Sequence, residues 1–151
     1  MEANTYPDPR VSRYVNEFAI PVQFNVVEDP GATARYHSFW TPTVMLYDVD
    51  GNEYRRSYGM LTPERFLSEM SLGYALRFLH SGQFEKTLEK VEDALEYTRA
   101  DPLRHAENYY WLGVAKYRAT DDPDGLGEGW QELRSHYPDS DWARKTDFFF
   151  D

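Results

Sequence analysis

The spacing of apolar residues changes at Thr62, and this change limits the folds that are open to the chain. Before Thr62, apolar residues alternate or run together over short segments such as 20–27 and 43–47, a pattern that predicts β-strands. After it, they recur every three or four residues, which is the spacing of one face of an α-helix. We therefore predict an α/β domain over residues 1–81 and helical hairpins over residues 82–151.

Turn and cap residues set the limits of the expected elements. Asp8 before Pro9 is a typical helix start, because the carboxylate can cap the helix and proline is tolerated in its first turn. The elements expected in the first domain are a helix at 9–18, a strand at 20–27, a short helix at 31–39, strands at 43–47 and 53–58 joined by a turn at 48–52, and a helix from 62 to about 81.

The helical part contains two similar segments. Leu72-Gly73 and Leu112-Gly113 lie 40 residues apart, and each segment ends near a proline. This pattern resembles degenerate tetratricopeptide hairpins, although the family repeats about every 34 residues and needs about three units to be stable alone. We expect these hairpins to be an appendage of the first domain, and an ordinary helical bundle with coincidental spacing is the alternative.

Composition excludes several functions. The chain has 16 basic and 26 acidic residues, a net charge of −10, which argues against nucleic acid and against a basic membrane-surface helix as partners. The absence of cysteine excludes disulfides, thiolate nucleophiles and cysteine-ligated metals, and fits the cytoplasm. The four histidines lack metal-ligand spacing. We expect no catalytic residue, no metal and no cofactor, and no apolar run is long enough to cross a membrane.

The most specific local feature is the run Trp40-Thr41-Pro42-Thr43, which leads into a strand and is followed by a hairpin and by Gly59. This succession resembles the C-terminal half of the thioredoxin fold. The resemblance implies a cis Thr41–Pro42 bond and a groove for an extended peptide that is lined by Trp40, Thr41, Pro42 and Gly59. The alternative for Trp40 is that its ring simply covers the end of the sheet.

The resemblance also implies what is missing. In the thioredoxin family the redox cysteines and the central strand precede the segment that matches Met1-Glu2. The expected fold is therefore an incomplete thioredoxin-like fold, with about three strands in a mixed sheet. We expect the strands at 20–27 and 43–47 to pair directly, to borrow a strand from another copy, or to belong to a longer polypeptide, which is the option we favour.

These observations lead to three hypotheses on function. The first is a non-catalytic module that binds an extended peptide or protein partner. The second is a fragment of a thiol–disulfide oxidoreductase whose redox motif lies upstream of Met1. The third is a homodimer that forms through the unpaired edge of the sheet. An aromatic cluster in the helical part could line a ligand groove, but core packing is the simpler role: Tyr109, Tyr110, Trp111, Tyr117, Trp130 and Tyr137.

Overall fold

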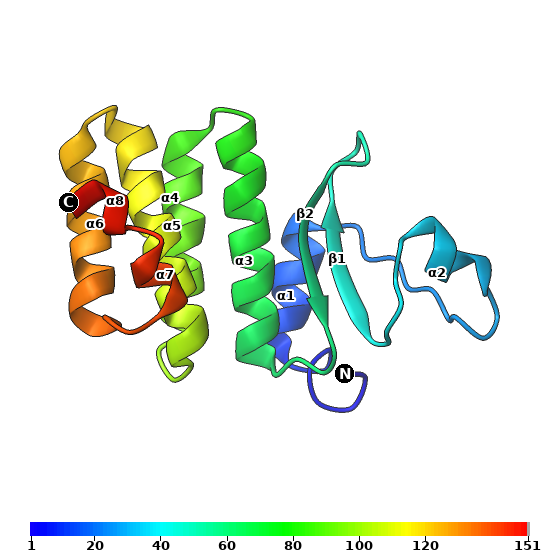
Figure 1. The fold of residues 1–151 in the computed structure, drawn as a ribbon. Helices are drawn as coiled ribbons and strands as arrows, with labels where there is room; N and C mark the ends of the chain where they lie inside the picture. Colours follow the sequence, from blue (N-terminus) through cyan, green and yellow to red (C-terminus); the bar gives the residue numbers. More distant parts are fainter. Residues whose placement is uncertain (151) are drawn as a thin grey trace. The chain divides into compact units, whose positions relative to one another are not determined.

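A computed structural model describes residues 1–150 as a mostly helical chain (Figure 1). The chain consists of two compact units, residues 1–67 and the residues from Ser68 on. The boundary between them falls inside the helix Pro63–His80. The elements in chain order are α1 (Pro9–Phe18), α2 (Gly31–Arg35), β1 (Thr43–Tyr47), β2 (Glu53–Tyr58), α3 (Pro63–His80), α4 (Phe84–Tyr97), α5 (Pro102–Thr120), α6 (Pro123–His136), α7 (Asp141–Arg144) and α8 (Asp147–Phe150).

Helix α1 begins where its sequence predicts. The Asp8 carboxylate accepts a hydrogen bond from the backbone N–H of Arg10 at 2.8 Å, and Pro9 occupies the first turn. Val11 and Tyr14, one turn apart, are both buried. Arg10 also forms an ion pair with Glu64 at 2.7 Å, which connects α1 to the start of α3 within the first unit.

Strands β1 and β2 form the predicted hairpin. They pair antiparallel, with Thr43 opposite Tyr58 and Met45 opposite Arg56, and a register shift follows Leu46. In the turn the Asp48 carboxylate accepts from the backbone N–H groups of Asp50 and Asn52, at 3.0 and 2.9 Å. Hydrogen bonds from the Asn52 side chain and backbone are the main cause that lowers the pKa of Asp48 to about 2.

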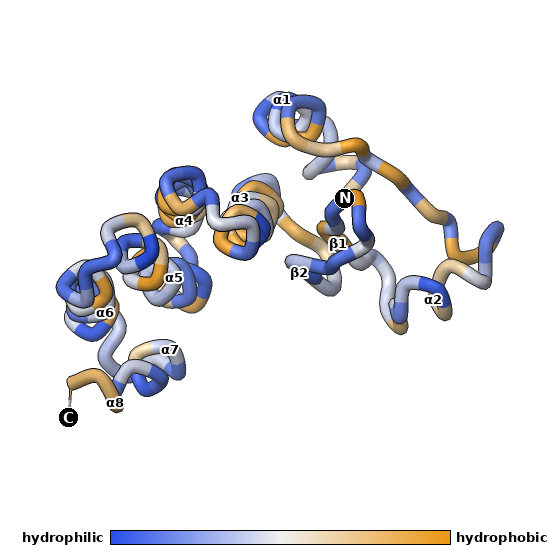
Figure 2. Tube along the Cα trace, turned by 90° about the horizontal axis from the view of Figure 1, so that it is seen from above, coloured by the Kyte–Doolittle hydropathy of each residue, from blue (hydrophilic) through white to orange (hydrophobic). Residues whose placement is uncertain are grey.

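The predicted three-stranded mixed sheet is wrong. Among residues 1–150 the structure has one sheet, with two antiparallel strands, and residues 20–27 form no strand beside it. A thioredoxin-like fold is therefore not supported, and neither is direct pairing of this segment with β1. Figure 2 shows its apolar residues, in orange, on the path between α1 and α2. Ile20 and Val22 are 92% and 69% exposed. Branched side chains favour a strand only when a neighbouring strand is present to pair with, and Pro21 removes one donor.

Helix α3 matches the helix expected from 62 to about 81, and α4, α5 and α6, which follow it, lie side by side (Figure 1). The aspartates Asp101 and Asp122 cap α5 and α6, and each precedes a proline in the first turn. One core cluster joins the second unit's part of α3 to α4 and α5: Leu72, Ala75, Val91, Ala94, Leu112 and Ala115. The short helices α7 and α8 were not predicted.

Two glycines bring α5 and α6 into backbone contact. A Cβ atom placed on Gly129 would lie 2.5 Å from the Cα atom of Gly113, and one on Gly113 would lie 2.6 Å from Cδ1 of Trp130. Neither separation is tolerated between real atoms, so both positions require glycine. Trp130 is buried and donates its indole N–H to the carbonyl of Tyr110 at 3.0 Å, which holds the ring against this contact. The Leu112-Gly113 pair therefore marks a close helix crossing.

Replacement of Gly129 by alanine should separate α5 from α6. We expect Gly129→Ala to lower the free energy of unfolding by about 2 kcal/mol or more, because the methyl group meets backbone that has no room to move. Chemical denaturation measures the loss. Gly31→Ala is the matched control, since its Cβ would meet only the Asp29 side chain, at 3.3 Å. An equal effect of the two substitutions would contradict the backbone contact.

Candidate peptide-binding site

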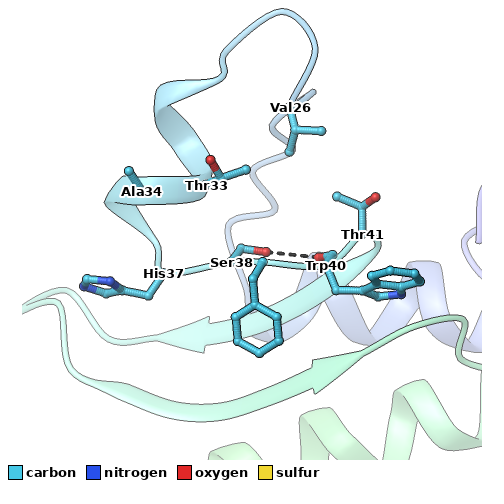
Figure 3. A pocket seen from close by; sticks show the side chains of 8 residues that line it. Val26, Thr33, Ala34, His37, Ser38, Trp40 and Thr41 are labelled. Carbon is cyan, nitrogen blue, oxygen red and sulfur yellow. Dashed lines mark hydrogen bonds between the residues drawn. The ribbon is translucent and has the colours of Figure 1, made fainter.

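An open cavity of about 700 Å³ lies in the first unit (Figure 3). One side is formed by α2 and the segment before it, and the other by the chain that leads from α2 into β1. Its walls combine apolar side chains with a few hydroxyl groups, the usual composition of a binding pocket. The lining residues are Val26, Thr33, Ala34, His37, Ser38, Phe39, Trp40 and Thr41.

Short-range hydrogen bonds fix the loop that forms the lower wall. The Ser38 hydroxyl donates to the carbonyl of Trp40 at 3.1 Å, drawn as the dashed line in Figure 3, and lies 3.0 Å from the Thr43 hydroxyl. Thr43 also donates to the Trp40 carbonyl. These bonds connect the loop to the first residue of β1. The Trp40 backbone is therefore held in place while its side chain remains exposed to solvent.

Arg56 holds the other end of the same loop. Its guanidinium donates to the carbonyl of Tyr36 at 2.9 Å and to that of His37 at 3.2 Å. It also forms an ion pair with Glu53, and hydrogen bonding from Arg56 lowers the pKa of the Glu53 carboxyl. His37 itself has φ of 50°, a left-handed conformation that reverses the chain at this point.

Two large aromatic side chains of this loop are exposed. Phe39 is 82% and Trp40 is 64% exposed, although each offers a large apolar surface. The Phe39 ring packs only on Tyr58 among the ring contacts of the described residues, at 4.9 Å between centroids. Two exposed aromatic rings beside a cavity make this loop a candidate contact surface.

The structure brings together part of the predicted site. Trp40 and Thr41 line the cavity, whereas Pro42 and Gly59 lie outside its lining. The prediction of a cis Thr41–Pro42 bond is confirmed. Gly59 has φ of 84° and donates its N–H to the carbonyl of Pro42 at 2.8 Å, so it continues the pairing of β1 with β2. The exposure of Trp40 argues against a ring that covers the end of the sheet.

The upper wall was missed by sequence reasoning. Thr33 and Ala34 belong to α2, and Val26 lies in the segment that was expected to be a strand. The predicted helix at 31–39 ends at Arg35, so residues 37–39 are free to line the cavity. A histidine two residues beyond the helix was the available signal, because His is one of the residue types that enter the left-handed region more often than most.

The aromatic cluster of the second unit is largely a packing unit. The Tyr109 ring stacks on His105 at 4.9 Å and on His136 at 5.5 Å, and the Tyr137 hydroxyl lies 3.0 Å from Nδ1 of His105. A hollow of about 340 Å³ adjoins this stack. Tyr110 and Trp130 also contact rings of α7 and α8, Tyr110 with Trp142 and Trp130 with Phe148 and Phe149. These ring-to-ring contacts favour the packing role over a ligand groove.

Across residues 1–150, no group of three or more His, Cys, Asp or Glu side chains is placed to hold a metal ion. Over the same range, every helix is too short or too polar to cross a lipid bilayer.

In comparisons with known proteins, no family model, no curated protein and no solved structure matches the chain. The thioredoxin-like and tetratricopeptide-like resemblances therefore receive no support from relatives.

His105 should make the fold sensitive to acid. Burial, and then the nearby His136 and Arg99, lower the pKa of the His105 imidazole. In the unfolded chain the His105 imidazole has a pKa of about 6.5, so the unfolded chain binds more protons than the folded chain. We expect the free energy of unfolding to fall as the pH drops below about 6.5. Denaturant titrations at pH 7.5, 6.5 and 5.5 measure this slope.

The slope should decrease in His105→Gln, which cannot be protonated. His80→Gln is the matched control, because His80 is an exposed histidine at the end of α3. An unchanged slope in His105→Gln would contradict the assignment.

Proposed function

We propose that this chain is a non-catalytic protein-interaction module that binds an extended apolar segment of a partner protein in the cavity beside α2. The observation that carries the proposal is the exposure of Phe39 and Trp40 next to an open cavity. Exposed tryptophan beside a concave surface is typical of residues that dominate the energy of protein interfaces.

The lining suits a peptide. Val26, Ala34 and the two aromatic rings offer apolar surface to side chains, and Ser38 and Thr41 offer hydroxyl groups to a backbone. The Ser38 hydroxyl already donates to Trp40, so it has lone pairs left to accept a hydrogen bond from an incoming N–H. An extended segment presents alternating side chains and backbone groups, and this combination matches both kinds of wall.

Two features favour a non-catalytic role. The sequence has no cysteine, so thiol chemistry has no nucleophile. The carboxylates of the first unit whose pKa values are lowered, Asp8, Asp48, Glu53 and Glu64, take part in capping, turn or ion-pair contacts outside the cavity. The cysteine-free composition also fits the reducing cytoplasm, which we propose as the compartment.

A displayed library of random ten-residue peptides tests the proposal. We expect the selected peptides to be apolar and to bind the intact chain in calorimetry. Trp40→Ala should weaken the best of them by about 30-fold or more, the effect of losing an interface hot spot of about 2 kcal/mol. Val49→Ala is the matched control, since Val49 is 96% exposed at the tip of the hairpin.

Trp40→Ala also distinguishes a loss of peptide binding from a loss of stability. Because Trp40 is exposed, Trp40→Ala should leave the thermal melting temperature nearly unchanged. A loss of stability of about 3–5 kcal/mol would instead indicate a core tryptophan. Full peptide affinity in Trp40→Ala, or failure to select any apolar peptide, would overturn the proposed function.

A further inference from the structure

Strand β1 has one paired and one open edge. In antiparallel pairing, the residues whose backbone groups point at the partner strand alternate with residues whose groups point away. The bond from Gly59 N–H to Pro42 O sets this alternation, so Val44 and Leu46 point toward β2. The backbone groups of Thr43, Met45 and Tyr47 therefore point away from β2. Across residues 1–150 the sheet contains no further strand to receive them.

The two edges of the sheet differ in chemistry. Strand β2 carries Glu53, Arg55 and Arg56, and charged residues of this kind commonly protect an edge strand from pairing. Strand β1 has the sequence Thr-Val-Met-Leu-Tyr, with no charge and no proline. Such an edge is a template for another strand, and it lacks the usual features that prevent pairing.

We propose that β1 pairs with β1 of a second copy of this chain, antiparallel and with a two-fold axis at Met45. In this register Met45 lies opposite Met45 of the second copy, and Thr43 lies opposite its Tyr47. The outward backbone groups of both strands are then satisfied by roughly six hydrogen bonds. The interface is isologous, as in most dimers of identical chains.

Charge favours a second copy as the occupant. An uncharged strand that faces itself places no like charges opposite one another. Residues 1–67 hold six basic and nine acidic residues, a net charge of −3, so most of the chain's −10 belongs to the second unit. Repulsion between two sheet edges is therefore small. Since five residues on each side make a small interface, we expect a weak dimer that depends on concentration.

A single cysteine reports on the two-fold axis. The chain contains no cysteine, so Met45→Cys introduces one thiol per copy. Hydrogen-bonded residues of an antiparallel pair have Cα atoms about 5.5 Å apart, within the range of a disulfide. Under diamide, a thiol oxidant, we expect Met45→Cys to form disulfide-linked dimers on the order of tenfold faster than Val49→Cys, whose thiol is more exposed but off the axis. Equal or slower linkage would overturn the proposal.

Proline at the same position tests the backbone bonds. The Met45 N–H points away from β2, so Met45→Pro removes no backbone hydrogen bond within one chain, and proline is tolerated at such edge positions. The only bond lost within the described part of the chain is the one that the Tyr47 hydroxyl donates to Sδ of Met45, at 3.8 Å. Sedimentation equilibrium should show a monomer–dimer equilibrium for the natural chain and a monomer for Met45→Pro. Circular dichroism confirms that the variant folds. A folded Met45→Pro variant that still dimerises as well as the natural chain would contradict pairing through β1.

The natural chain gives a third test that needs no substitution. Amide hydrogen exchange at Thr43, Met45 and Tyr47 should slow as the protein concentration rises, because these N–H groups become bonded in the dimer. The amides of Val44 and Leu46, already bonded to β2, serve as internal controls. Exchange that does not change with concentration would overturn the proposal. None of these measurements involves Trp40 or an added peptide, so their outcome is independent of the proposed function.

Discussion

Arg56 joins the two-stranded sheet to the loop that builds the candidate site, and the first unit depends on this side chain. Its guanidinium reaches the carbonyls of Tyr36 and His37 while it stays paired with Glu53. A carbonyl that accepts from a charged donor forms a stronger bond than one that accepts from a neutral group. The end of α2 is thereby held near β2, and the chain from Ser38 to Thr41 must cross the space between α2 and β1. The cavity exists because this crossing is fixed at both ends.

The same arrangement explains which features were predictable from sequence. Helix α1 and the hairpin follow from local signals: the Asp8 cap, the proline after it, and the Asp-Gly turn. Local hydrogen bonds form these elements, so nearby residues are enough to predict them. The segment 20–27 has the composition of a strand, but a strand needs a neighbour, and no local signal shows whether one is present. Of the candidate site, Trp40 and Thr41 were found, whereas Val26, Thr33 and Ala34 were not, because the cavity depends on contacts between distant segments.

The two units differ in how much of their apolar surface is buried. In the second unit, helices cover one another, and the glycine contact of α5 with α6 removes even the space of a methyl group. In the first unit, two strands, two short helices and the first turn of α3 offer too little surface to cover the aromatic and branched residues of this unit. As a consequence, several large apolar side chains remain exposed to solvent: Ile20, Val22, Phe39 and Trp40. Exposed apolar surface is costly in water, so the larger share in the first unit supports the binding surface proposed there, although Leu103 and Phe148 of the second unit are also exposed.

The cavity and the open edge of β1 meet at Thr43. Its side chain donates to the Trp40 carbonyl in the cavity wall, and its backbone is the first outward-facing pair of groups on the edge. A strand that pairs with β1 would restrict the backbone of Thr43, and through that hydrogen bond it would restrict Trp40. A peptide in the cavity would restrict the same residue from the other side. Thermodynamic linkage requires that the effect of dimerisation on peptide affinity equals the effect of bound peptide on dimer affinity. If dimerisation strengthens peptide binding by a given factor, bound peptide strengthens dimerisation by that factor.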